Sequence, residues 1–121
     1  MAQGKILVVD DSATEMLLIT SALKGEGYAI VTATTGEEAM QRLGSEQPDL
    51  VVLDVVLPGK NGFQLCRQIR NDVRWGTLPV ILLTSKDGDA DKFWGMKQGA
   101  SEYMTKPFEA PALLASVRRH I

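Results

Sequence analysis

The sequence has few cysteines and no excess of charge of one sign. Cys66 is the single cysteine, which excludes an intramolecular disulfide, and we expect it to be a small buried core residue. The 13 Lys and Arg residues oppose 15 Asp and Glu, so the formal net charge is −2. This balance provides no broad basic field for nucleic acid or for an acidic membrane.

Long hydrophobic runs are also missing. No apolar stretch approaches the ~18 residues of a membrane span, and residues 1–4 are not a signal peptide. We therefore expect a cytoplasmic protein that neither binds nucleic acid nor inserts into a membrane. Its 121 residues are 45% hydrophobic and 23% charged, without repeats or linkers, which fits one globular domain. We expect residues 1–121 to form that single domain, without an effector domain.

Residues 50–53 are an unbroken apolar run that ends on a carboxylate, Asp54. Because Pro48 and Pro58 flank the run, it predicts a short strand buried on both faces, as in a parallel sheet. Asp54 would then lie at the carboxyl end of the strand, where ligands bind in open α/β sheets. A carboxylate there has lost part of its hydration, so we expect nearby groups to compensate its charge.

Strands and helices are expected to alternate along the whole chain. The apolar runs predict strands at residues 6–9, 29–32, 50–53, 80–83 and 103–105. Helical spacing predicts helices within residues 12–25, 35–44, 63–71 and 89–98 and from 111 onward. Ser12 with Glu15, and Thr35 with Glu38, match capping boxes at the first two helix starts. The adjacent Phe93 and Trp94 cannot share a helix face, so we expect one to pack inward.

This alternation predicts one (βα)5 α/β domain, a flavodoxin-like doubly wound parallel sheet with helices on both faces. With strand order 2-1-3-4-5, the winding direction reverses between the first and third strands, and ligands bind at such a reversal. Asp10, Asp11 and Asp54 end these two strands. The order therefore predicts that three carboxylates converge.

Clustered carboxylates repel one another unless a cation joins them. Oxygen ligands without Cys or His favour a hard ion, and Mg²⁺ is the natural choice. An acidic rim that binds nothing is the alternative. Two more strand ends complement a phosphate, because Thr84 can donate a hydroxyl and Lys106 can supply an ammonium. All of these groups would lie on one edge of the sheet.

This ordered set resembles the receiver domain of the two-component response-regulator family, from residue 5 to the last helix. The matching residues are Asp10-Asp11, Asp54 with the loop of residues 57–62, Thr84-Ser85, Tyr103 and Lys106-Pro107. The resemblance implies a signalling protein that accepts a phosphoryl group, not an enzyme, although it assists its own phosphorylation and dephosphorylation.

The resemblance also implies a role for each site residue. Asp54 would accept a phosphoryl group from a histidine kinase. Asp11, Asp54 and the backbone carbonyl of Val56 would bind Mg²⁺, with Asp10 acting through water.

The remaining matched residues would bind the phosphoryl group and transmit its arrival. Thr84 and Lys106 would hold the phosphoryl oxygens. Thr84 would move toward them, Tyr103 would rotate into the space behind it, and a charge event would thereby become a packing event. The Lys106–Pro107 peptide bond would be cis.

A narrower resemblance is to single-domain receivers of the PilH and CheY type, which belong to chemotaxis-like pathways such as those of type IV pili and twitching motility. The matching stretches are residues 10–16, 84–87, 91–95 and 98–100. It implies a CheA-like histidine kinase as donor and a stand-alone monomer. Its fourth helix, fifth strand and fifth helix would contact a downstream protein.

Other functions stay open at this point. The chain could be the receiver portion of a larger regulator with a DNA-binding or enzymatic output domain. A phosphohydrolase with an aspartyl-phosphate intermediate would need a second Asp where this chain has Val56. A flavin-binding protein of similar fold would want a Ser-, Thr- or Gly-rich loop in place of Asp10-Asp11.

Overall fold

A five-stranded parallel sheet forms the centre of the protein, in a computed structural model that describes residues 4–121. Its order, β2-β1-β3-β4-β5, confirms the predicted one. The strands are β1 (Lys5–Val9), β2 (Ala29–Ala33), β3 (Leu50–Leu53), β4 (Val80–Thr84) and β5 (Glu102–Thr105). The helices are α1 (Ala13–Lys24), α2 (Gly36–Glu46), α3 (Gly62–Asn71), α4 (Asp89–Lys97) and α5 (Ala110–His120). Residues 1–3 lie outside the described residues, so the prediction that residues 1–4 are not a signal peptide falls mostly outside the structure.

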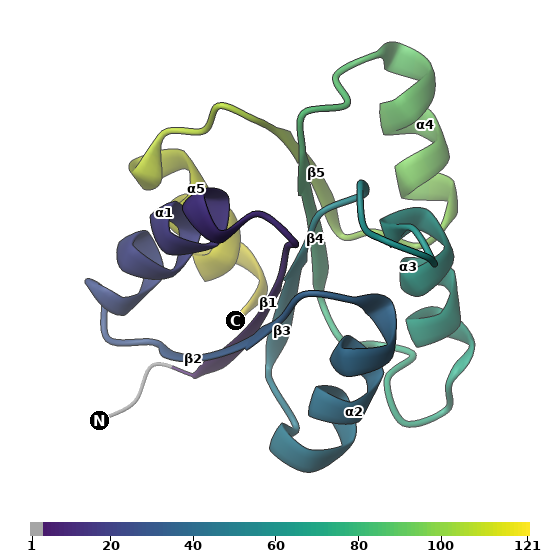
Figure 1. Ribbon diagram of the computed structural model, residues 1–121, viewed down its shortest axis with the longest axis horizontal. Helices are drawn as coiled ribbons and strands as arrows, with labels where there is room; N and C mark the ends of the chain where they lie inside the picture. Colours follow the sequence, from purple (N-terminus) through teal and green to yellow (C-terminus); the bar gives the residue numbers. More distant parts are fainter. Residues whose placement is uncertain (1–3) are drawn as a thin grey trace.

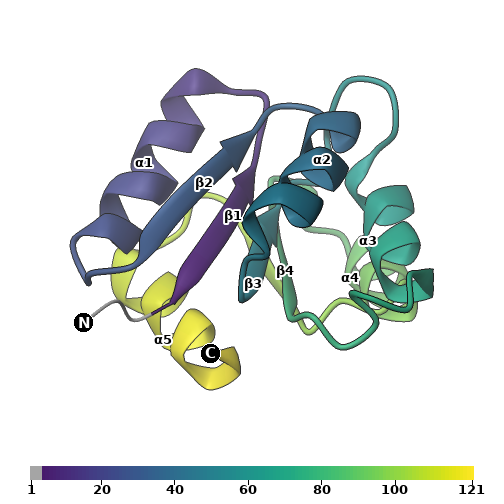
Figure 2. The same ribbon diagram turned by 90° about the horizontal axis from the view of Figure 1, so that it is seen from below.

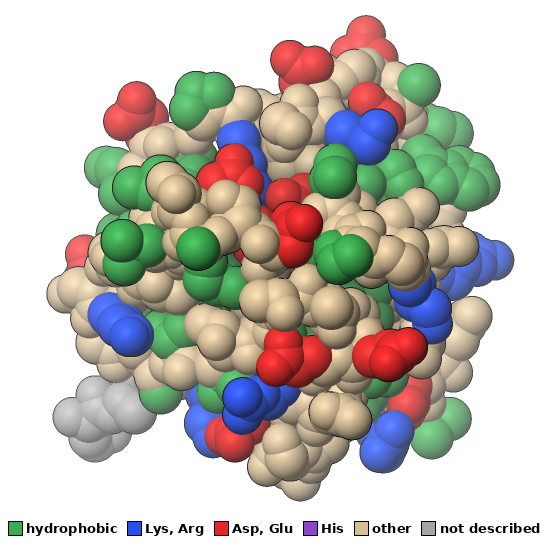
Figure 3. Space-filling view, viewed as in Figure 1, with side chains coloured by type: hydrophobic (Ala, Val, Ile, Leu, Met, Phe, Trp, Pro, Cys, Tyr) green, Lys and Arg blue, Asp and Glu red, His purple; other side chains and the backbone are tan. Residues whose placement is uncertain are grey.

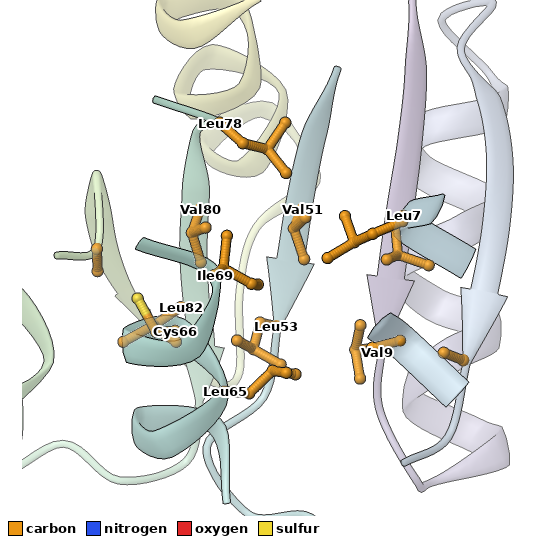
Figure 4. Packing of buried hydrophobic residues seen from close by; sticks show 14 of the residues in the cluster. Leu7, Val9, Val51, Leu53, Leu65, Cys66, Ile69, Leu78, Val80 and Leu82 are labelled. Atoms are coloured by element: carbon orange, nitrogen blue, oxygen red, sulfur yellow. The ribbon is translucent and has the colours of Figure 1, made fainter. Parts of the chain in front are cut away.

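Helices cover both faces of the sheet, with α1 and α5 on one face and α2, α3 and α4 on the other (Figures 1 and 2). Side chains alternate between the faces along each strand, so β1, β3 and β4 supply two cores and must be apolar throughout. The core toward α2 and α3 (Figure 4) includes Leu7, Val9, Val51, Leu53, Val80, Leu82, Leu43, Leu65 and Ile69. The core toward α1 and α5 includes Ile6, Val8, Leu50, Val52, Ile81, Leu83, Ile19, Leu23 and Val117. Within residues 4–121, no helix is both long and apolar enough to span a membrane.

Cys66 is fully buried in the core toward α3, as expected (Figure 4). Burial raises the pKa of its thiol to about 11, against the opposing influence of the Arg70 charge. Its S–H lies 3.5 Å from the carbonyl oxygen of Gln98 and donates to it. Because the thiolate is the reactive form, this cysteine is a packing residue at neutral pH.

Gly62 fixes the path of the chain beneath Asp54. Its N–H donates to the carbonyl oxygen of Val55 at 2.8 Å and closes the loop between β3 and α3. A Cβ at this position would overlap the carbonyl oxygen of Asp54 and would lie 2.7 Å from the Cα of Val55. The first residue of α3 must therefore be glycine for the loop to fold back against the end of β3.

Gly62→Ala is expected to lower the free energy of unfolding by about 1–3 kcal/mol, the usual cost of forcing atoms into filled space. Urea unfolding followed by circular dichroism measures the change. Gly44→Ala is the matched control, because Gly44 is also helical and a Cβ there meets nothing within 4 Å. That variant should be neutral or more stable by up to about 1 kcal/mol. Equal effects at both positions would contradict this account of the loop.

The expectation that Phe93 or Trp94 packs inward is wrong. Phe93 is 63% exposed and Trp94 is 52% exposed. The physical reason is Gly95, the buried residue of α4. A Cβ on Gly95 would lie 2.7 Å from the Tyr103 ring and 2.9 Å from a methyl group of Leu82. The helix therefore approaches the sheet through its glycine, and both aromatic side chains flank the contact.

Candidate functional site

Lys106 lies at the edge of the sheet where the parallel strands end. Its ammonium nitrogen is 2.7 Å from Asp10 Oδ2, 2.8 Å from Asp54 Oδ2 and 2.8 Å from Glu15 Oε2. The side chains of Lys106 and Asp54 are each 7% exposed and that of Asp10 is 1% exposed. Acidic side chains gather between α1 and α4 on the face shown in Figure 3. Three carboxylates thus share one cation.

Asp54 is held at both of its carboxylate oxygens. Oδ1 accepts a hydrogen bond from the N–H of Val56 at 3.1 Å, and Oδ2 accepts from Lys106. The backbone N–H of Asp54 donates to the carbonyl oxygen of Val9 at 3.0 Å, which extends the pairing of β3 with β1. The strand pairing and the two side-chain bonds together fix the direction of the carboxylate.

The charges of this site do not balance. Burial raises the pKa of Asp10 above its ordinary value, even though Lys106 and the N–H of Ser12 stabilise its carboxylate. Burial works against the charge of Lys106, but its hydrogen bonds to Asp10, Asp54 and Glu15 outweigh this and raise its pKa. One ammonium offsets only one of the three carboxylate charges. The remaining excess favours a divalent cation, and the oxygen-only donor set suits Mg²⁺.

Glu15 is the site residue that the sequence reasoning missed. Ser12 caps α1, because its hydroxyl accepts from the N–H of Glu15 at 3.3 Å. The other half of the predicted capping box is not formed: the Glu15 carboxylate bonds to Lys106, and the Ser12 N–H donates to Asp10 at 2.9 Å. Glu15 lies in the first turn of α1, five residues after Asp10 and facing the same edge of the sheet. This spacing is the sequence signal that could have identified it.

Asp11 is not the third member of the carboxylate group. Asp10, Glu15 and Asp54 have oxygen atoms within 4.8 Å of one another. Asp11 is exposed and lines a neighbouring hollow beside α1. The expected convergence of three carboxylates is therefore found for Asp10 and Asp54, whereas Asp11 lies outside this group and lines the same hollow as Asp10.

Thr84 and Tyr103 both bond to the backbone of one residue, Lys86. The buried Thr84 hydroxyl oxygen accepts from the N–H of Lys86 at 3.3 Å. The Tyr103 hydroxyl donates to the carbonyl oxygen of Lys86 at 2.7 Å. Burial, with the charges of Asp91, Asp54 and Asp87, raises the pKa of Tyr103 to about 12. The loop after β4 is therefore tied to both side chains.

The Lys106–Pro107 peptide bond is cis, as the resemblance implied. Pro107 and Lys106 also line a mainly apolar pocket of about 500 Å³ between α1 and the segment before α5. Glu15, Leu18 and Phe108 contribute to the same pocket. The buried Lys106 is therefore approachable from the side of α1.

Carboxylates and a lysine at the ends of parallel strands, on this fold, define a doubly wound α/β domain with a charged site at the carboxyl edge of its sheet. The family model of the response regulator receiver domain matches residues 6–118. The chain therefore belongs to the response regulator receiver family.

Three proteins illustrate the similarity. The chain is 42% identical to the protein PilH of Pseudomonas aeruginosa over 114 residues, which is 94% of each chain. It is 43% identical to the alkaline phosphatase synthesis transcriptional regulatory protein PhoP of Bacillus subtilis over 94% of this chain, but only 47% of PhoP. The structure resembles that of chemotaxis protein CheY4 of Vibrio cholerae, with a TM-score of 0.91, 30% identity and coverage of 100% and 99% of the two chains.

Proposed function

We propose that Asp54 accepts a phosphoryl group from a histidine kinase in a Mg²⁺-dependent reaction, and that the chain acts as a stand-alone response regulator. The observation that carries the proposal is the Asp54 carboxylate, held by Lys106 and the Val56 N–H beside two further carboxylates. An oriented carboxylate with a neighbouring cation suits nucleophilic attack on phosphorus.

The chemistry requires positioning and charge neutralisation more than covalent assistance. An oxygen of Asp54 would attack the phosphorus while the bond from phosphorus to the kinase histidine breaks and its electron pair stays on the imidazole. Lys106 would neutralise the incoming phosphoryl oxygens, and Thr84 would donate its hydroxyl to one of them. A bound Mg²⁺, held by Asp11, Asp54 and the Val56 carbonyl with Asp10 through water, would supply further positive charge.

Incubation with acetyl phosphate and Mg²⁺, followed by mass spectrometry, tests the phosphoacceptor. One base-labile phosphoryl group should be added, and peptide mapping should assign it to Asp54. Chelation of Mg²⁺ should prevent the addition. Addition at a serine, or addition of equal extent in the presence of a chelator, would oppose the proposal.

The Mg²⁺ site gives a separate prediction. Titration with Mg²⁺ should shift the amide NMR signals of residues 10–12, 54–57 and 106. Asp11→Ala should weaken the affinity for Mg²⁺ by about tenfold or more, because the Asp11 carboxylate would supply both a negative charge and a ligand atom. Asp49→Ala, a loss of the same charge at the opposite end of β3, should leave it intact. Equal loss in both variants would remove Asp11 from the assignment.

We further propose that phosphorylation switches the face formed by α4, β5 and α5. The proposal rests on the backbone of Lys86, whose N–H bonds to Thr84 and whose carbonyl bonds to Tyr103, and on the packing of Tyr103 against Gly95 of α4. Movement of Thr84 toward a phosphoryl group would release one of these ties and alter the other. Typical coupling of this kind is about 1–3 kcal/mol, or roughly 5- to 150-fold in partner affinity.

Beryllofluoride, which mimics the phosphoryl group, tests this switch. It should shift the NMR signals of residues 84–106 far more than those of α2, because α2 has no tie to Thr84 or Tyr103 among the bonds described above. Thr84→Ala should reduce the shifts at Tyr103 while the shifts at Asp54 persist. Shifts concentrated in residues 35–44 would place the output elsewhere.

The pathway is proposed from the relatives. The match to PilH over nearly its whole length supports a stand-alone regulator. The structural match to the chemotaxis protein CheY4 supports a chemotaxis-like pathway, and the narrower resemblance of the sequence adds a CheA-like kinase and control of type IV pilus motility or taxis. The partial match to PhoP supports the alternative, a receiver portion of a larger regulator. The mass of the protein in its native cell, measured by immunoblot, separates the two.

A further inference from the structure

A groove of about 570 Å³ lies between α3 and α4, away from the Lys106 site. The two helices run beside one another in both ribbon views (Figures 1 and 2). The groove is lined by Phe63, Gln64, Arg67, Trp94 and Lys97, among others. None of the functions proposed above uses it.

An exposed aromatic side chain lines this groove, and a second one is adjacent to it in α4. Trp94 is 52% exposed in the groove wall, and the adjacent Phe93 is 63% exposed. Figure 3 shows hydrophobic side chains spread over α4. Gly95 forces this exposure, because it turns both aromatics away from the sheet. Exposed Trp beside Arg is typical of residues that carry binding energy at protein interfaces.

The two cations of the groove lack acidic partners. Arg67 donates only to the side-chain oxygen of Gln98, at 3.4 Å, and the Lys97 ammonium lies 5.3 Å from the centre of the Phe93 ring. Neither has a carboxylate within 4.0 Å in the described part of the chain, and no acidic residue lines the groove. By contrast, Arg74 and Arg119 each pair with a carboxylate at 2.9 Å. The groove is thus a positive, aromatic site on a protein of net charge −2.

We propose that this groove binds an acidic segment of a partner protein that carries a large apolar side chain. The apolar side chain packs between Phe63 and Trp94, and the carboxylates meet Arg67 and Lys97. Nucleic acid fits less well, because its affinity grows with the number of phosphates neutralised and the groove offers two cations. The interaction does not require phosphorylation of Asp54, so its failure and that of the phosphoacceptor proposal are separate results.

Selection from a random peptide library on the unphosphorylated protein tests the proposal. The recovered peptides should be rich in Asp and Glu and should contain a large apolar residue. These peptides should not bind to the Lys97→Glu variant and should still bind to the Lys24→Glu variant. Lys24 is the matched control, because both lysines are exposed and lie in the last turn of their helices.

A synthetic copy of a recovered peptide then locates the contact. It should change the fluorescence of Trp94 in a Trp75→Phe background and shift the amide signals of residues 61–67 and 93–98. Trp94→Ala should weaken its affinity by about tenfold or more. The proposal is overturned by the absence of recovered peptides, by neutral or basic ones, by equal binding to Lys97→Glu, or by tighter binding of a single-stranded oligonucleotide.

Discussion

Asp54→Asn is expected to abolish phosphoryl incorporation from acetyl phosphate while the protein stays folded. The amide is nearly the same size as the carboxylate, and its oxygen can still accept from the Val56 N–H or from Lys106. It is a poor nucleophile, because the amide oxygen lacks the negative charge that a carboxylate oxygen carries. The variant also removes one negative charge from a site with too many, so its stability should not fall. Mass spectrometry measures incorporation, and circular dichroism measures the fold.

Asp49→Asn is the matched control for this prediction. Asp49 precedes β3, whereas Asp54 follows it, and its carboxylate accepts from the backbone N–H of Lys5 at 2.8 Å. Incorporation should be unchanged in this variant. Retention of the phosphoryl group in Asp54→Asn, or its assignment to Ser12 or Ser85, would refute Asp54 as the acceptor.

Lys106→Met should lower the free energy of unfolding at pH 7 by about 3 kcal/mol, the low end for removal of one partner from a buried ion pair. The substitution leaves the buried carboxylates of Asp10 and Asp54 without their shared cation. Urea unfolding gives the measurement. Lys5→Met is the control, because its pair with Glu46 is 37% and 34% exposed and should contribute less than about 1 kcal/mol.

The loss in Lys106→Met should depend on pH in a defined direction. The folded-state pKa of Asp10 is raised, so the folded protein holds this proton more tightly than the unfolded chain and gains stability as pH falls. Protonation also removes the repulsion that Lys106 no longer offsets, so the defect should shrink on acidification. In the wild type, the raised pKa of Lys106 contributes stability below its ordinary pKa of 10.5, and that contribution is lost as pH rises through the folded value. A defect that grows on acidification would contradict this account.

The sheet and the meeting of Asp10, Asp54 and Lys106 could be predicted because they follow from simple periodicity. Unbroken apolar runs mark buried parallel strands, and parallel strands end at the same edge. Any polar residue directly after such a strand is then placed to within a few ångströms, without knowledge of the loops. The strand order does not follow from periodicity; it is the order typical of a flavodoxin-like fold.

The parts that failed depend on local backbone direction and close packing. Glu15 has the spacing of a capping residue, and no pattern in the sequence states that Lys106 competes for its carboxylate. Asp11 lies in the turn into α1, outside the group formed by Asp10, Glu15 and Asp54. The exposure of Phe93 and Trp94 depends on the rotation of α4, which Gly95 decides through a contact with Tyr103 from a distant part of the chain.

The number of hydrogen bonds that the Lys106 ammonium can donate limits how a phosphoryl group could bind to it. An ammonium carries three N–H donors, and Asp10, Glu15 and Asp54 each occupy a separate contact with it. All three donors are therefore in use, so a phosphoryl oxygen can bond to Lys106 only if one of the carboxylates leaves. Glu15 is the carboxylate whose bond to Lys106 costs least free energy to break, because water can solvate it. Its side chain is 41% exposed, against 1% for Asp10 and 7% for Asp54. The departure of Glu15 would break the ion pair between the first turn of α1 and the segment after β5. Binding of the phosphoryl group would then also alter the face of the sheet opposite α4.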